Sequence, residues 1–183
     1  MKLQSLIGIA ILSQQNGFAL THAVPSEVKT SQIKTLICDA YAGETKTVTS
    51  PDCMNGIFYD SDSTRDESEV SMILQRQSTL TICKFYVTKS LSESNAVLDG
   101  CQYFEAPKSC SQTVRNAVAV ALAQSFPAVA GSFSIERIKY QRTLQNKRFY
   151  EVATTDEVEN ERWTVQALGN KYKCTVKSVK YLE

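Results

Sequence analysis

SQTVRNAVAVALAQ, at Ser111–Gln124, is the clearest helical segment of the chain. Its apolar residues recur at intervals of three and four, Ser111 can cap its amino end, and Pro127 prevents a long extension beyond Gln124. Its single charged residue is Arg115. Because so little of this helix is suited to contact with water, we expect it to be largely buried against other elements.

The residues after this helix have the composition of β-strands. Short runs of β-branched and aromatic residues alternate with polar turns at Asp156–Glu161 and Gly169–Asn170. One main helix followed by an antiparallel meander is an α+β arrangement, and we expect the helix to pack on the sheet. The predicted strands contain Phe133 and Ile135, Ile138–Leu144, Arg148–Ala153, Arg162–Leu168 and Lys171–Val179.

The residues before the helix predict a mixture of elements. Leu80–Thr88, LTICKFYVT, is rich in β-branched and aromatic residues and predicts a strand, and Ala96–Tyr103 predicts the next one. The Ile and Leu content of Ile33–Ala40 favours a short strand. Ser61–Glu69 is polar and acidic, which is typical of a loop, and we expect it to lead into a short helix through Val70–Gln77.

Residues 1–23 have the pattern of a secretory signal peptide. Lys2 supplies the positive start, Leu6–Leu12 the apolar core, and Thr21–Ala23 a small-x-small cleavage site. A membrane anchor would need roughly 18 or more apolar residues, and polar residues end this run after Leu12. We therefore expect a soluble, secreted protein that is cleaved after Ala23 or Ala19 and has no membrane partner.

The single histidine of the chain, His22, lies within this leader or at the frayed start of the mature chain. The folded protein is therefore expected to have no imidazole, which excludes Ser-His-Asp and Cys-His catalysis. The remaining acid–base groups would be carboxylates, most of which lie in a charged turn typical of a solvated loop, so a carboxylate-only hydrolase is a minor alternative. These carboxylates are Glu151, Asp156, Glu157, Glu159 and Glu161.

The charge of the chain is balanced overall but uneven along its length. One of the 20 basic residues lies in the leader, which leaves 19 basic and 19 acidic residues. Residues 24–100 carry 7 basic and 11 acidic residues, whereas residues 101–183 carry 12 basic and 8 acidic ones. We therefore divide the mature chain into an acidic half, 24–100, which is an extension or a degenerate repeat, and a basic half, 101–183.

All six cysteines follow the leader, and an even number in an oxidising compartment predicts a disulfide framework. Fifteen pairings are possible. The intervals from Cys38 to Cys101 and from Cys110 to Cys174 are 63 and 64 residues, which indicates either a faint duplication or coincidence. The scattered spacing disfavours a zinc site, and we expect no metal and no cofactor. The disulfide candidates are Cys38, Cys53, Cys83, Cys101, Cys110 and Cys174.

Cations and aromatic residues are interleaved on the predicted strands of the basic half. Cations bind phosphates and aromatic faces stack on unpaired bases, so a sheet that carries both predicts a surface for single-stranded RNA. The alternative is that the aromatic rings enter the core and the cations only keep the sheet soluble. The RNA-binding candidates are Lys139, Tyr140, Arg142, Lys147, Arg148, Tyr150, Arg162, Lys171, Tyr172 and Lys173.

The basic half also carries five short motifs in a fixed order. They are CSQTVRNAVAVA at Cys110–Ala121, Phe126-Pro127, RFYEV at Arg148–Val152, RWTV at Arg162–Val165 and NKYKC at Asn170–Cys174. Together they resemble the ribonuclease-like secreted effectors of powdery mildew fungi, which are plant pathogens. The resemblance covers Cys101–Val179, and two features depart from it: Lys108-Ser109-Cys110 replaces the usual Y-x-C opening, and the acidic half has no counterpart in the short members.

The resemblance implies a ribonuclease-like fold in which Cys110 pairs with Cys174. Catalytic members use a histidine with a carboxylate and an arginine, and here Glu151 and Arg162 would stand at the last two positions without a histidine. The resemblance therefore implies a virulence effector that is not an enzyme. It would bind host plant RNA or a host protein, around or inside host cells, as a monomer that does not bind DNA.

A cystatin-like protease inhibitor is the alternative from another class, because it also has one helix across an antiparallel sheet. It would insert loops into a host protease. The chain contains no Q-x-V-x-G loop, which weakens this interpretation.

Overall fold

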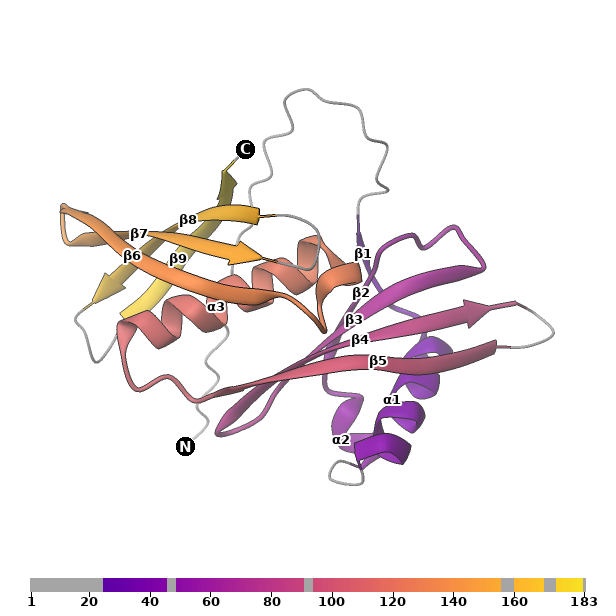
Figure 1. Ribbon diagram of the computed structural model, residues 1–183. Coiled ribbons are helices and arrows are strands. Elements are labelled where there is room, and N and C mark those ends of the chain that lie inside the picture. Colours follow the sequence, from indigo (N-terminus) through magenta and orange to yellow (C-terminus); the bar gives the residue numbers. More distant parts are fainter. Residues whose placement is uncertain (1–24, 46–48, 91–93, 156–159, 170–173, 183) are drawn as a thin grey trace. The chain divides into compact units, whose positions relative to one another are not determined.

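A computed structural model describes residues 25–45, 49–90, 94–155, 160–169 and 174–182 (Figure 1). Its described helices and antiparallel sheets confirm an α+β protein. The expected signal peptide and its cleavage sites lie outside these residues. Two compact units are present. The N-terminal unit comprises described residues of 25–106 and 122–133, and the C-terminal unit those of 107–121 and 134–182.

The N-terminal unit contains a five-stranded antiparallel sheet in the order β1-β2-β3-β4-β5. Two helices lie between its first two strands in the chain. The predicted strands at Leu80–Thr88 and Ala96–Tyr103 are confirmed as β4 and β5. The elements are β1 (Ser26–Glu27), α1 (Ser31–Thr45), α2 (Ser50–Cys53), β2 (Ile57–Asp60), β3 (Glu67–Gln75), β4 (Thr79–Lys89) and β5 (Ser94–Glu105).

The C-terminal unit contains a four-stranded antiparallel sheet in the order β6-β7-β8-β9. The predicted main helix is confirmed as α3 (Cys110–Ser125), and the unit boundary falls after its Ala121. The predicted meander is confirmed as well. Its strands are β6 (Ser134–Leu144), β7 (Lys147–Thr155), β8 (Asn160–Gly169) and β9 (Cys174–Leu182), and a short 3-10 helix, η1 (Pro127–Val129), precedes them.

The units differ from the halves expected from charge in two ways. The change of unit along the chain occurs at Ala106, a few residues after the expected position, and residues 122–133 return to the N-terminal unit. In both units a helix precedes four strands that pair in sequential order: α1 before β2–β5, and α3 before β6–β9.

The prediction of a strand at Ile33–Ala40 is wrong, because these residues belong to helix α1. Ile33, Leu36, Ile37 and Ala40 recur at intervals of three and four, so they lie on one side of a helix. Ile37 and its neighbour Cys38 are fully buried against the sheet residues of the same hydrophobic core. The β-branched content of the segment suggested a strand, and tertiary packing overrides that weak preference.

The predicted helix through Val70–Gln77 is also wrong, because Glu67–Gln75 forms strand β3. Its central residues, from Val70 to Leu74, are all buried. Val70, Met72 and Leu74 belong to the core that contains α1 residues. Ser71 points to the other face, where its Oγ donates a hydrogen bond of 2.6 Å to the Ala123 carbonyl. A strand buried on both faces has no polar alternation, so periodicity alone does not separate it from a helix.

The segment 122–133 covers part of that second face. Gln102 of β5 donates a hydrogen bond of 2.6 Å to the Phe133 carbonyl, and the Phe104 and Phe133 rings stack with centroids 6.3 Å apart. Gly100 of β5 and Gly131 approach each other so closely that a Cβ atom on Gly131 would lie 2.9 Å from the Gly100 oxygen.

A Gly131→Ala variant is therefore expected to lose stability, by roughly 1–3 kcal/mol, because backbone atoms would have to move apart. Gly43→Ala is the matched control. Gly43 lies in α1, and no atom lies within 4 Å of the position that an added methyl group would take, so alanine should stabilise the helix by up to about 1 kcal/mol. Urea unfolding followed by far-ultraviolet circular dichroism measures both changes, and equal effects of the two variants would contradict the close approach.

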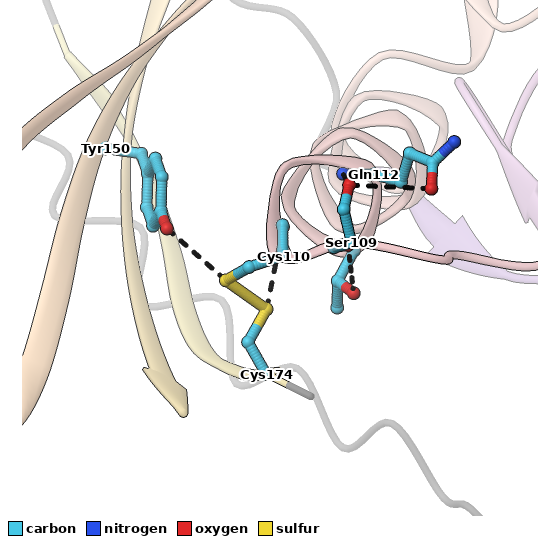
Figure 2. The surroundings of a disulfide bond; sticks show 6 residues. Ser109, Cys110, Gln112, Tyr150 and Cys174 are labelled. Atoms are coloured by element: carbon cyan, nitrogen blue, oxygen red, sulfur yellow. Dashed lines mark hydrogen bonds between the residues drawn. A yellow bond between two sulfur atoms is a disulfide. The ribbon is translucent and has the colours of Figure 1, made fainter. Parts of the chain in front are cut away.

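Helix α3 begins one residue earlier than predicted, and Ser109 caps it instead of Ser111. The Gln112 amide donates to Ser109 Oγ at 3.3 Å (Figure 2). The Lys108 amide donates to Gln112 Oε1 at 2.7 Å. The expectation that the helix is largely buried is confirmed, since Ser111 is its only exposed residue.

The six cysteines form three disulfides, which confirms the predicted framework. Cys110 pairs with Cys174, as the resemblance implied. The interval from Cys38 to Cys101 does not correspond to a bond. Cys38 of α1 pairs with Cys53 of α2, and Cys83 pairs with Cys101, which lies directly opposite it on the neighbouring strand.

Two lysines of the N-terminal unit are largely buried in ion pairs. Lys89 Nζ lies 2.6 Å from Asp60 Oδ2, and the two side chains are 13% and 4% exposed. Lys84 Nζ lies 3.0 Å from Asp99 and 3.3 Å from Glu69. Burial would lower the pKa of Lys84, yet its contacts with Tyr86, Asp99 and Glu69 together raise it. Part of the acidity of this unit thus serves to neutralise buried cations.

Candidate nucleic-acid interface

The sheet of the C-terminal unit has one buried face. Alternate residues of β7, namely Tyr150, Val152 and Thr154, are buried, as are Val165 and Ala167 of β8. Tyr150 pairs with Val165 across the two strands, so these residues share a face. Because successive side chains of a strand point to opposite faces, Phe149 and Glu151 lie on the other one.

The other face carries the exposed cations of the hairpin β6–β7. The strand register pairs Arg142 with Phe149, Lys139 with Glu151, and Lys147 with Leu144. We call the face defined by Lys139, Arg142, Lys147, Phe149 and Glu151 the open face. Its three cations are exposed, and Phe149 and Glu151 are half-buried.

Two further cations share the open face. Arg137 pairs with Ala153 of β7, and Lys180 of β9 pairs with Thr164 of β8, which in turn pairs with Glu151. Both are exposed. Arg162 of β8 pairs with Ala153 in the strand register. The cations thus come from separate strands that the antiparallel register brings together.

The candidates predicted from the sequence divide between the two faces. Lys139, Arg142 and Lys147 lie on the open face, whereas Tyr140, Arg148 and Tyr150 lie on the opposite one. Tyr150 is only 5% exposed, and its hydroxyl donates to Cys110 Sγ at 3.3 Å (Figure 2), so its ring is not available to a nucleobase. Tyr140 contacts the Tyr150 ring edge-on. Lys171, Tyr172 and Lys173 lie outside the described residues.

Phe149 is the aromatic residue of the open face, and the sequence-based selection missed it. The Arg142 guanidinium carbon lies 5.3 Å from the centre of its ring. Side chains from Phe149 to Thr154 alternate between the two faces of the sheet. The sequence shows this alternation, but it does not show which face is buried until Tyr150 is known to point into the core.

The two glutamates of the β6–β7 hairpin form hydrogen bonds and, within the described residues, no ion pair with its exposed cations. Glu151 accepts a hydrogen bond of 2.6 Å from Gln141, and Glu136 accepts one of 3.2 Å from Thr155. Within the described part of the chain, no carboxylate lies within salt-bridge distance of Lys139, Arg142 or Lys147. The positive charge of the open face is therefore available to an anionic ligand.

The tip of the hairpin is a two-residue turn. Gln145 and Asn146 have φ values of 48° and 62°, which is the left-handed conformation of a type I′ turn. This turn lets β6 and β7 continue to Leu144 and Lys147. Leu144 is 54% exposed at the tip. The hairpin thus presents Arg142 and Lys147 to solvent at its end.

The described residues contain no histidine, and within them no group of three or more acidic or cysteine side chains is placed to hold a metal ion. Asp156, Glu157 and Glu159 lie outside the described residues. A shallow cavity of about 460 Å³ in the N-terminal unit is lined by Asp62, Glu67, Glu69 and Arg65, among others. Asp62 is already paired with Arg65 at 2.9 Å, and hydrogen bonds from Thr64 lower its pKa.

No helix in the described ranges has the length and apolar character needed to cross a bilayer. Comparison with protein-family models, curated proteins and solved structures found no match.

Proposed function

We propose that the open face of β6–β9 binds single-stranded RNA without cleaving it, and that the protein is a secreted, disulfide-stabilised effector of a plant-pathogenic fungus. The observation that carries the binding proposal is the set of exposed cations Lys139, Arg142 and Lys147 around Phe149, with no carboxylate of the described residues within salt-bridge distance of them. Phosphate groups would supply the negatively charged partners that these cations lack among the described residues.

The proposal includes a ribonuclease-like arrangement in which α3 packs on the buried face of the sheet. Three contacts support it. The Cys110–Cys174 disulfide joins the start of α3 to the start of β9, Tyr150 of β7 donates to Cys110 Sγ, and Arg115 of α3 donates a hydrogen bond of 3.0 Å to the Ile135 carbonyl of β6. The resemblance to secreted ribonuclease-like effectors suggests host RNA as the ligand, and the expected removal of His22 with the leader suggests binding without turnover.

The test is equilibrium binding of a labelled single-stranded RNA over a range of salt concentrations. Affinity should fall with salt, with a slope of about 0.7 on logarithmic axes for each phosphate contact. Arg142→Glu/Lys147→Glu should weaken binding roughly tenfold or more at low salt, because two contacts become repulsive.

Lys29→Glu/Lys108→Glu is the matched control. It changes the net charge equally, and both lysines are exposed and lie outside the sheet. It should retain nearly all of the affinity. Absence of binding at low salt, or equal losses in the two variants, would refute the proposed interface.

Incubation of the protein with total RNA tests the absence of catalysis. We expect no cleavage above that of an Arg162→Ala variant, since the described residues contain no histidine that could transfer the proton. Reproducible turnover that the Arg162→Ala variant lacks would show an enzyme instead of a binding protein.

A cystatin-like inhibitor is the second candidate, and one observation favours it. In the N-terminal unit, α1 contributes Ile37 and Tyr41 to a core that also contains Phe58 and Phe85 of an antiparallel sheet. This agrees with the one-helix, one-sheet arrangement of such inhibitors. A panel of cysteine proteases separates the two candidates, because inhibition that survives Arg142→Glu/Lys147→Glu would assign the activity to another surface.

A further inference from the structure

We infer that Arg142 and Phe149 form the position at which the open face receives an unpaired base, which stacks on the Arg142 guanidinium. This inference rests on the proposed RNA binding and deepens it, since it specifies a base-bearing single strand as the ligand. The observation is the contact between the Arg142 guanidinium and the Phe149 ring, with 5.3 Å between the guanidinium carbon and the ring centre.

The contact holds a flat cation at the surface. Arg142 is exposed and Phe149 is half-buried, so the ring supports the guanidinium while the guanidinium remains accessible to solvent. A guanidinium is planar, is weakly hydrated and stacks on aromatic systems, which an ammonium group does not do. Unpaired bases stack on arginine planes as well as on aromatic rings in RNA complexes.

The neighbours of this pair suit a nucleotide strand. Lys147 lies two residues before Phe149 on β7, and Glu151, which pairs with Lys139, lies two residues after it. Residues two apart on a strand are separated by roughly 6.6 Å on one face. A base at Arg142 would therefore have a cation on either side for the adjoining phosphates. Across the sheet, Phe149 pairs with Gln166, whose polar side chain is half-buried.

The other aromatic residues of the hairpin are not suited to this role. Tyr150 is buried, and the Tyr140 hydroxyl is hydrogen-bonded to Thr143 at 2.6 Å on the opposite face. A base in a duplex is already stacked and paired, so it cannot reach Arg142 without unpairing. The site should therefore discriminate among polyanions by their bases and not only by their charge.

The experiment compares three probes on the full secreted chain by fluorescence anisotropy: an oligouridine, an abasic oligomer with the same number of phosphates, and an RNA duplex. Wild type should prefer oligouridine. Arg142→Lys keeps the positive charge but removes the planar guanidinium on which the base would stack. It should weaken oligouridine binding roughly tenfold, which is at the lower end of what one stacked base contributes, and it should leave binding of the abasic oligomer unchanged.

Arg65→Lys is the control, because it makes the same exchange at an exposed arginine of the N-terminal unit, away from the open face, and it should not weaken binding of either single-stranded probe. Phe149→Leu should reproduce the effect of Arg142→Lys, with circular dichroism to show that the fold is retained. If wild type binds none of the probes, the proposed function itself fails. If it binds oligouridine and the abasic oligomer equally and Arg142→Lys changes neither, phosphate binding stands and the stacking position is refuted.

Discussion

A Cys110→Ala/Cys174→Ala variant is expected to unfold its C-terminal unit with about 4 kcal/mol less free energy than the intact protein, by the chain-entropy relation for a 64-residue loop. The bond joins the start of α3 to the start of β9, so it restrains the unfolded chain across the whole meander. In the folded protein it also accepts the Tyr150 hydroxyl hydrogen bond. Removal of the Cys110–Cys174 bond should therefore lower the free energy of unfolding more than removal of either other disulfide does.

Urea unfolding followed by tryptophan fluorescence measures this effect selectively. Trp163 is the single tryptophan of the chain and lies in β8, within the C-terminal unit. Cys38→Ala/Cys53→Ala is the control, because its 15-residue loop is worth about 3 kcal/mol and lies in the other unit. If the control lowers the Trp163 midpoint as much as the Cys110→Ala/Cys174→Ala variant does, the two units do not unfold independently and the assignment is wrong.

Asp60→Ala should destabilise the N-terminal unit by roughly 3–5 kcal/mol, because it leaves the Lys89 ammonium buried without its carboxylate. The substitution removes a second interaction as well. Asp60 Oδ1 accepts a hydrogen bond of 3.0 Å from the Asp62 amide, and Lys89 Nζ donates one of 3.0 Å to the Asp62 carbonyl. The loop after β2 is thus held by the same pair of side chains.

Circular dichroism during urea unfolding measures the loss, and two variants show its origin. Asp52→Ala breaks an exposed pair with Arg76 and should cost about 1 kcal/mol or less. Asp60→Ala/Lys89→Met removes both buried charges, so it should recover part of the stability lost in Asp60→Ala. A double variant less stable than Asp60→Ala would mean that the buried charge is not the cause.

Several elements were accessible from local patterns. Helix α3 has a long apolar repeat that is followed by Pro127, and β4 has a dense run of β-branched and aromatic residues. The local sequence of each segment is therefore enough to predict its conformation. The disulfide framework was predicted from composition, because six cysteines follow a predicted secretory leader. The exception within α3 is its cap, because Ser109 and Ser111 are equally suitable residues and only the geometry selects Ser109.

The N-terminal errors concern segments whose apolar residues fit two conformations. Ile33–Ala40 suits a strand by composition and a helix by spacing, and burial of its apolar side in the core that contains Phe58 and Phe85 favours the helix. β3 is buried on both faces, so its apolar residues do not alternate with polar ones and their spacing does not distinguish a strand from a helix. The strand is stabilised by pairing with β2 and β4, which lie elsewhere in the chain.

Residue types and their spacing determined that this chain is an α+β protein with a basic second half, because helix and strand patterns are local. Tertiary structure alone separated Phe149 from Tyr150. Adjacent residues of a strand point to opposite faces, so an aromatic pair always contributes one ring to each face. Which ring enters the core depends on the strands opposite and on Cys110, far away in the chain. The same long-range contacts place Arg142 over Phe149 and leave its charge exposed.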